Sequence, residues 1–541
     1  MTDPACIKGD TPLRKILISI AILAVVTLLV YGNSFNNGFL MDDEEIIVNN
    51  PQTLSLSKIP DVFFAPDMVK PYYRPLNRAS YLLDFQVAGM EPVWYHGVNI
   101  FIHLGNAVLL FLLLRLLLRD HLAALAAALL FAVHPANAEA VNFVSARNTL
   151  MALFFALASF LSYIQGRAQG KKLLWFSSLL YFCSLLSKET GLMMSAVFFI
   201  ATFIRLQESE CTLGWRERIT LLAPYGALTL VYFAMRTYSL QGIVGTPFHA
   251  EGLFSRVAIN YHIIPQYITL LLFPADLTFF HKVPQGGLFS PWWYLPVLLL
   301  LLAVIVRIFR RGNRIAIFAF GWMVINYIPI SNIVPIPSDP ITERFLYMPA
   351  VGFFVWVGLL WGAMNTSERA RRWLIPATAS VIVAFSVLTF QRNLDWKNNL
   401  SLFSSGVRND PASYGAHYNL GTAYLENGDT TSARREWETT LRLNPQHAEA
   451  MVQMGTLAAM RGDLGTAERY YVAALAAPPG ETDPDKAMAH LNLGKICEKR
   501  GQLREALQHY QHFLRTVPLT YLEYKGEVEK KVKSLMSTVK G

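Results

Sequence analysis

The chain has 541 residues, of which 53% are hydrophobic and only 16% charged, with a formal net charge of +9. A soluble globular chain is usually about 45–50% apolar and about 25% charged, and the excess apolar residues here form long runs, which excludes a wholly soluble protein. Because the basic residues lie between these runs, membrane topology explains the positive charge better than nucleic-acid binding. The four cysteines show neither metal-ligand spacing nor a disulfide framework.

A membrane-spanning helix needs about 20 mostly apolar residues, and eleven segments meet or approach this length. The first lacks a small-residue cleavage pattern, so we expect it to be retained. Short Lys- and Arg-rich loops should face the cytoplasm, which places residues 1–14 there and the first loop, 32–96, outside. A further apolar segment, 258–273, would move a later arginine cluster outside if it spanned, so we expect it to be re-entrant or interfacial. The predicted spans are 15–33, 97–118, 121–134, 139–163, 172–187, 190–206, 217–236, 292–309, 314–331, 345–365 and 372–390.

The first outer loop carries an acidic run, Asp42, Asp43, Glu44 and Glu45, shortly after the first span. The loop is long and rich in Tyr, Trp and Pro, which predicts short helices along the membrane surface and a functional role. An acid at this position can act on a hydroxyl group that arrives from water and on a reactive group carried by a lipid. The alternative is an acidic cap at the start of a surface helix.

Further charged residues lie at the outer ends of predicted spans or, in the case of Arg74, in the first outer loop, all on the same side as the acidic run. Ionisable groups at membrane depth are unfavourable by about 2.5–3.5 kcal/mol each. Cations suit a phosphate or diphosphate, and a carboxylate suits deprotonation of an attacking hydroxyl. Snorkelling anchors or helix caps are alternatives for most of them, but Arg147 enters an apolar helix and needs a buried anionic partner. The residues are Arg74, His134, Glu139, Arg147, Lys188, Glu189, Glu343 and Arg344.

The composition changes to water-soluble after residue 395. A set of Gly, Ala, aromatic and Pro residues at 421–445 recurs 34 positions later, at 455–479, and a third time after a short insertion. This is the period and pattern of the tetratricopeptide repeat. The sequence therefore predicts a transmembrane domain at 15–395 and a repeat domain at 396–541. The repeat domain is expected to contain a partial repeat at 396–413 and repeats at 414–447, 448–481 and 487–520.

Five short motifs occur in a fixed order before the repeats. Their series resembles that of the transmembrane-and-tetratricopeptide-repeat protein O-mannosyltransferases and, more broadly, of GT-C glycosyltransferases that use lipid-phosphate sugars. The resemblance implies an all-α fold, in which a polytopic membrane helix bundle of about eleven spans precedes an α-solenoid. The short repeat array and the lack of an ER-retention tail lead us to expect a bacterial relative. The motifs are Met41-Asp42-Asp43, Arg74-Pro75-Leu76, His134-Pro135 with Glu139-Ala140-Val141 and Arg147, Ser187-Lys188-Glu189, and Glu343-Arg344-Phe345-Leu346-Tyr347.

We therefore expect an inverting glycosyltransferase that moves a mannose-like sugar from a polyprenyl- or dolichyl-phosphate to a hydroxyl of a protein or glycan. The reaction is expected on the extracytoplasmic face, which is periplasmic for a bacterial inner membrane, and the repeats are expected to hold a polypeptide acceptor. A divalent cation is compatible with this chemistry but not indicated, because adjacent acids are not the Asp-x-Asp metal motif. The expected roles are base for Asp42 or Asp43, phosphate binding for Arg74, Arg147, Lys188 and Arg344, and ordering of the site for His134, Glu139, Glu189 and Glu343.

Two alternatives remain open at this stage. A polysaccharide polymerase or O-antigen-ligase-like enzyme also combines many spans with repeats, but it should concentrate Arg and His in a large late outer loop. The late outer loop here, 333–343, is short, and the large loop comes first. A membrane-anchored repeat scaffold without catalysis would have the same tail, but it would leave the outer-face charges unexplained.

Overall fold

The computed structural model divides the chain into two compact units, Met1–Asn398 and Asn399–Gly541. Within the residues that it describes, every regular element is a helix, so the predicted all-α fold is confirmed. The described residues are 13–65, 72–204, 206, 213–240, 253–275, 277–281, 291–333, 340–478, 484–516 and 522–540.

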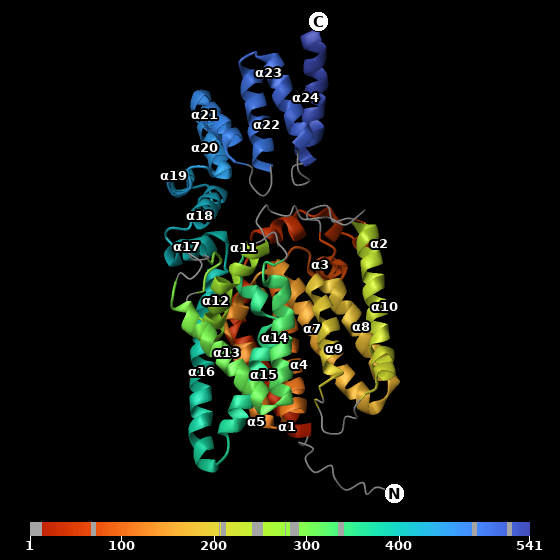
Figure 1. Ribbon diagram of the computed structural model, residues 1–541. Coiled ribbons are helices and arrows are strands. Elements are labelled where there is room, and N and C mark those ends of the chain that lie inside the picture. The colour runs from red at the N-terminus through yellow and green to blue at the C-terminus, as the bar shows by residue number, and fades with distance from the viewer. Residues whose placement is uncertain are drawn as a thin grey trace. The chain divides into compact units, whose positions relative to one another are not determined.

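The long helices of the first unit run side by side (Figure 1). In the described part of the chain, five helices are long and apolar enough to cross a membrane, or six if a pair bent by 53° at Pro135 is one span. The predicted count of eleven spans therefore stays a prediction. The five helices are α1 (Leu13–Val30), α4 (Pro92–Leu118), α7 (Arg147–Gln169), α10 (Trp215–Ser239) and α16 (Glu368–Asp395).

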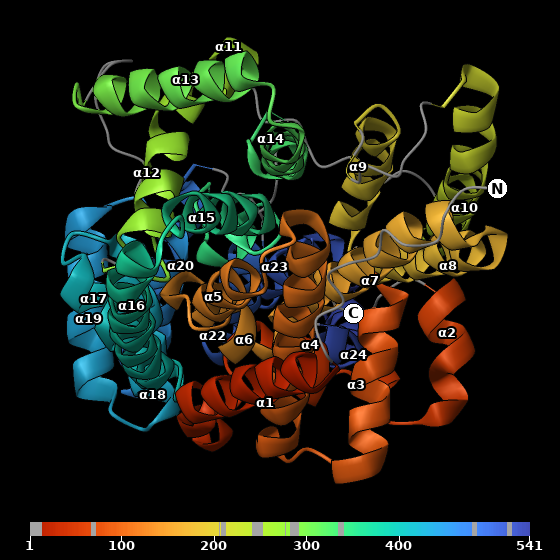
Figure 2. The same cartoon turned by 90° about the horizontal axis from the view of Figure 1, so that it is seen from below.

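Further helices complete the first unit. Helix α12 covers most of the segment 258–273, and its 13 residues are fewer than a span requires. Figure 2 shows α4 and α5 toward the centre of the unit, with α1 on one side and α15 on the other. The further helices outside the first loop are α5 (His121–Ala132), α6 (Ala138–Asn142), α8 (Lys171–Ser187), α9 (Met193–Ala201), α11 (Leu253–Ala258), α12 (Asn260–Leu272), α13 (Tyr294–Arg311), α14 (Arg314–Tyr327) and α15 (Ala350–Met364).

The described part of the first loop consists of short helices, as the sequence predicts. In Figure 1 these red and orange segments lie at the end of the bundle opposite the start of α1. Their position at a membrane surface stays a prediction. The elements are the 3-10 turns η1 (Gly32–Asn36), η3 (Pro51–Thr53) and η4 (Leu56–Lys58), one turn of π-helix, η2 (Glu44–Val48), and the helices α2 (Ile59–Phe64) and α3 (Pro75–Ala88).

The second unit consists of eight helices in its described residues, and they follow the repeat period. In each full repeat a glycine of the first helix faces an aromatic ring of the second, so that a Cβ would lie 2.5–2.7 Å from the ring. These pairs are Gly421 with Trp437, Gly455 with Tyr471, and Gly494 with Tyr510. The helices are α17 (Asn399–Asn409), α18 (Tyr414–Glu426), α19 (Thr430–Leu443), α20 (Ala448–Met460), α21 (Leu464–Ala476), α22 (Pro484–Lys499), α23 (Leu503–Thr516) and α24 (Leu522–Lys540).

Candidate functional site

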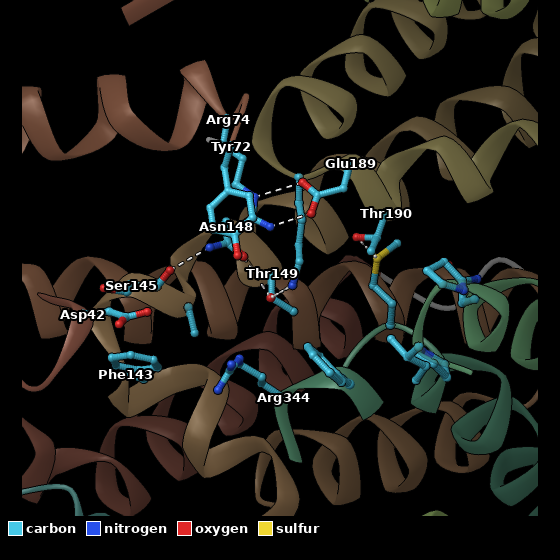
Figure 3. A pocket seen from close by; sticks show the side chains of 18 of the residues that line it. Asp42, Tyr72, Arg74, Phe143, Ser145, Asn148, Thr149, Glu189, Thr190 and Arg344 are labelled. Carbon is cyan, nitrogen blue, oxygen red and sulfur yellow. Dashed lines mark hydrogen bonds and ion pairs between the residues drawn. The ribbon is translucent and has the colours of Figure 1, made fainter. Parts of the chain in front are cut away.

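A cavity of about 260 Å³ opens where the first loop, the start of α7 and the two turns η7 (Glu189–Leu192) and η9 (Glu343–Leu346) meet. Four of the charged residues singled out in the sequence line it together with Asp42 (Figure 3). Its remaining lining is mainly aromatic, aliphatic and hydroxyl-bearing. The charged lining residues are Asp42, Arg74, Lys188, Glu189 and Arg344.

Asp42 reaches the cavity from a tight turn. The Asp43 N–H donates to the carbonyl of Leu40 at 2.8 Å, and Met41 between them has a φ of 47°, in the left-handed region. Such a backbone is unfavourable for a residue other than glycine, and it often occurs at functional sites. The turn of π-helix η2 follows immediately, and π-turns are also frequent at such sites. The turn presents the partly exposed Asp42 to the cavity while its neighbour points inward.

Asp43 is fully buried and does not line the cavity. Its carboxylate accepts hydrogen bonds from the Leu40 N–H (3.1 Å), from the Ser145 N–H (2.7 Å) and from the Ser145 hydroxyl. Burial raises the pKa of Asp43 to about 7, against the opposing effect of the Ser145 hydrogen bonds. Asp43 therefore ties the turn of the first loop to the segment that precedes α7, whereas Asp42 lines the cavity.

Lys188 lies at the break between α8 and η7, where its own backbone is extended. Gly191 makes this tight turn possible, because a Cβ there would lie 2.7 Å from the backbone of Ser184. The Lys188 side chain is 8% exposed, and its ammonium donates to Thr149 Oγ1 at 2.7 Å. Burial, together with the positive charge of Arg74, lowers the pKa of Lys188 to about 7. The side-chain amine of Lys188 therefore faces the cavity in surroundings that favour its uncharged form.

Arg74 precedes α3 and forms a two-point ion pair with Glu189. Its Nε donates to Glu189 Oε2 at 2.9 Å and its Nη2 to Oε1 at 2.5 Å (Figure 3). The guanidinium also lies 4.3 Å from the ring centroid of Tyr72, which allows a cation–π contact. Burial raises the pKa of Glu189, but the adjacent Arg74 more than offsets this and lowers it to about 2. The pair therefore stays ionised over the physiological pH range.

Arg344 is held by Glu139 from two directions. The Glu139 carboxylate accepts from the Arg344 backbone N–H at 3.0 Å and forms an ion pair with its guanidinium. Glu139 is buried at the start of α6, directly after the turn η5 (Pro135–Asn137), and does not line the cavity. It orients Arg344, whose side chain remains 20% exposed and lines the cavity.

Arg147 does not line the cavity, although it lies in the same part of the fold. It is fully buried, and the anionic partner expected for it is Asp84 of α3. Its remaining N–H groups donate to Asn99 Oδ1 (2.8 Å), to the Ser80 hydroxyl (3.1 Å) and to the carbonyl of Tyr95 (3.1 Å). With these partners Arg147 connects α3, α4 and α7 and has no side-chain surface open to a ligand.

Two other predicted residues lie behind the cavity wall. His134 donates from Nε2 to the carbonyl of Leu271 at 3.1 Å and is 1% exposed. Glu343 is equally buried and accepts from Arg392 at 3.2 Å and from His281 at 3.3 Å. Neither side chain lines the cavity.

Sequence reasoning missed the residues that hold these charges in place. Asp84, Ser145 and Thr149 are short polar side chains in mixed surroundings, and no spacing marks them as partners of charges that lie 39 to 102 positions away in the chain. The one usable signal was the need of Arg147 for a buried anion. Among the described residues, no group of three or more His, Cys, Asp or Glu side chains is arranged to hold a metal ion.

Comparison with known proteins supports the two-part organisation. The sequence profile described as tetratricopeptide repeat matches residues 400–447, 418–482 and 452–518. The presence of tetratricopeptide repeats is therefore confirmed, and the bounds of the individual repeats stay a prediction. An oligosaccharyltransferase of Archaeoglobus fulgidus in its apo crystal form aligns with 79% of this chain and 60% of its own, at 12% identity and a TM-score of 0.39. A score of this size supports no conclusion about the fold.

Several curated protein O-mannosyl-transferases are similar to the chain over most of its length. One from Caenorhabditis elegans is 27% identical over 80% of this chain and 63% of its own length. Human TMTC1 is 26% identical over 81% of this chain and 56% of its own length. Human TMTC3 is 24% identical over 92% of this chain and 60% of its own length. The chain thus spans about 60% of the length of these relatives. It is a homologue of the transmembrane-and-tetratricopeptide-repeat O-mannosyltransferases, as its motif series predicts.

Proposed function

We propose that the chain is a membrane glycosyltransferase that moves a sugar from a polyprenyl- or dolichyl-phosphate to a hydroxyl group of a protein or glycan. The observation that carries this proposal is the composition of the cavity. It gathers the carboxylate of Asp42 and three cations, Arg74, Lys188 and Arg344, from four separate parts of the chain. Its second carboxylate, Glu189, forms an ion pair with Arg74. A hydroxyl acceptor and a phosphate leaving group need this combination. The names of the curated relatives are consistent with transfer of mannose.

In the proposed reaction, the Asp42 carboxylate accepts the proton of the acceptor hydroxyl. The acceptor oxygen bonds to the anomeric carbon of the sugar, and the bond from that carbon to the phosphate oxygen breaks. The electron pair stays on the phosphate, where Lys188, Arg74 and Arg344 stabilise the added negative charge. Attack opposite to the leaving group inverts the configuration of the anomeric carbon.

Several predicted residues act indirectly in this proposal. Asp43 holds the turn that presents Asp42, and Glu139 and Glu189 orient the two arginines that line the cavity. Arg147, which the sequence favoured as a phosphate ligand, supports the helices beneath the cavity through Asp84 instead. The sequence predictions that His134 and Glu343 order the site remain proposals.

The cavity also bears on the alternative of a repeat scaffold without catalysis. A scaffold does not need a cavity that is lined by a buried lysine, because the charge of a lysine is unfavourable in such surroundings. In the proposed enzyme the repeats bind the polypeptide acceptor, and the reaction takes place on the extracytoplasmic face, which is the periplasm in a bacterium.

A transfer assay tests the proposal. Purified protein in lipid nanodiscs is given a polyprenyl-phosphate mannose and a peptide rich in Ser and Thr, and the glycosylated peptide is measured by mass spectrometry. Loss of a general base typically lowers the rate by about 10²–10⁴-fold, so Asp42→Asn should lose activity by a factor in this range. The matched control is Glu45→Gln, which removes an exposed acid of the same loop outside the cavity and should keep full activity. Full activity of Asp42→Asn would refute the assignment.

A further inference from the structure

The three cations of the cavity are not equivalent. Arg74 and Arg344 each have a carboxylate of their own, Glu189 and Glu139. In the described residues, the ammonium of Lys188 has no carboxylate within ion-pair distance, and its hydrogen-bond partner is the hydroxyl of Thr149 at 2.7 Å. Of the three, Lys188 is therefore the cation whose charge the protein leaves uncompensated.

The charged groups around Lys188 are paired with one another. The charged groups that face it come from four elements: Arg74 before α3, Glu189 in η7, Arg344 in η9 and Glu139 in α6. Their charges cancel in pairs, and Asp42 is the further carboxylate among the charged residues of the cavity lining. The side chain is 8% exposed, lines the cavity, and has the ring of Phe345 at 5.8 Å.

Burial of an uncompensated ammonium is unfavourable, and a buried lysine usually responds by losing its proton. This agrees with the pKa of about 7 that burial and Arg74 give to Lys188. An anion that enters the cavity supplies the missing negative charge next to Nζ. Because an opposite charge nearby favours the charged form, the amine then gains a proton.

We propose that Lys188 is the group that selects a phosphate over an uncharged ligand in this cavity, and that it takes up one proton from solvent when the phosphate binds. This inference rests on the proposed function, because the lipid-phosphate donor is its natural ligand. The proton moves from the buffer to Lys188 Nζ, and no covalent bond of the ligand changes. Arg74 and Arg344 contribute positive charge at every pH, whereas Lys188 contributes it only when the anion is present.

Titration calorimetry tests the inference with two probes that each carry one pH-independent negative charge, methyl farnesyl phosphate and dimethyl phosphate. Binding to the full chain in nanodiscs is measured at pH 8 in buffers of different ionisation enthalpy, which gives the number of protons taken up. We expect close to one proton per site at pH 8 and almost none at pH 6, with affinity that falls about tenfold per pH unit above 7. Tighter binding of the farnesyl probe identifies a lipid carrier as the source of the phosphate, and binding of the two probes with equal affinity identifies the phosphate alone.

Two variants make the test specific. Lys188→Arg keeps a permanent charge and should bind the probes without proton uptake, while Lys188→Met should bind them at least tenfold more weakly and independently of pH. Elution volume and melting temperature confirm that both variants fold. The inference is overturned if neither probe binds, if the wild type binds without proton uptake at pH 8, or if Lys188→Arg takes up as many protons as the wild type.

The same data separate this inference from the proposed function. A protein that binds the diester with proton uptake but transfers no sugar would contradict the function and support the role of Lys188. A protein that transfers sugar but binds the donor phosphate without proton uptake would contradict only the role of Lys188.

Discussion

The charged residues of the first unit divide into two regions that differ in how completely their charges are satisfied. Behind the cavity, Arg147 is fully buried, paired with Asp84 and bonded to three further acceptors. At the cavity, Lys188 has a hydroxyl partner and no carboxylate among the described residues. Both are cations that the sequence placed at the outer end of a predicted span.

The neighbours Asp42 and Asp43 differ in where their side chains lie. Asp43 accepts three hydrogen bonds in the interior, and Asp42 lines the cavity. A charged group that is paired in the interior supports the fold, and a charged group that lines a cavity can contact a ligand. Substitutions behind the cavity should therefore change stability, whereas substitutions in its lining should change binding and rate.

The largest effect on stability is expected for Arg147→Met, because it leaves Asp84 as a buried charge without a partner. Removal of one member of a buried ion pair typically reduces stability by about 3–5 kcal/mol. Lys188→Met is the matched comparison, since it removes an uncompensated buried charge and should leave the melting temperature unchanged or higher. Melting followed by size-exclusion chromatography of heated samples measures both. If Arg147→Met and Lys188→Met lower the melting temperature equally, the distinction between the cavity lining and the region behind it is contradicted.

A smaller loss is expected for Asp43→Asn. The amide keeps one acceptor oxygen for Ser145, but its NH₂ group replaces the oxygen that accepts from the Leu40 N–H. A buried donor left without a partner reduces stability by about 1–3 kcal/mol. Asp42→Asn should melt at the wild-type temperature and lose transfer activity instead. A variant pair in which Asp42→Asn is the less stable protein would reverse the assignment of the two acids.

Glu139→Gln tests the connection between the two regions, because Glu139 lies behind the cavity but orients Arg344 in its lining. With its ion pair to Arg344 removed, that guanidinium is less well oriented. A hydrogen bond to a charged group contributes about 1.5–3 kcal/mol, so donor phosphate should bind roughly tenfold or more weakly, as calorimetry can measure. Glu368→Gln, which breaks the exposed pair with Arg371, is the control and should bind normally. Unchanged affinity in Glu139→Gln would show that Arg344 does not need this orientation.

The smallest effect is expected for Glu189→Gln, because its pair with Arg74 is partly exposed and such pairs contribute only about 0–1 kcal/mol. The pKa of Glu189 is lower in the folded chain than the usual value, so the unfolded state binds more protons between about pH 4.5 and 2. The stability from this pair is therefore complete above that range and is lost as the pH falls through it. Glu189→Gln should melt with a weaker pH dependence there. If the melting temperatures of Glu189→Gln and the wild type depend on pH in the same way, the lowered pKa of Glu189 is contradicted.

The parts of the fold that the sequence predicted are those with a local signal. The 34-residue period determined the repeats, because each Gly and aromatic pair, such as Gly455 with Tyr471, lies within one helix hairpin. Apolar runs located the helices of the first unit, but not which of them cross the membrane, since several are short or bent.

The candidate site was predictable in its list of charges and not in their arrangement. Nothing in the sequence distinguishes Asp42 from Asp43. The apolar surroundings of Arg147 indicate a buried anion but not which one, because the partners that decide these environments are remote. Ser145 is 102 positions from Asp43, and Asp84 is 63 positions from Arg147. Only the folded chain shows which charges are compensated.

The most direct test of the account is a structure of the chain bound to a non-hydrolysable prenyl-phosphate sugar. We expect the phosphate to contact Lys188 Nζ and the guanidinium groups of Arg74 and Arg344, with the Asp42 carboxylate on the opposite side of the anomeric carbon. A phosphate bound outside this cavity, or a sugar that does not face Asp42, would contradict it.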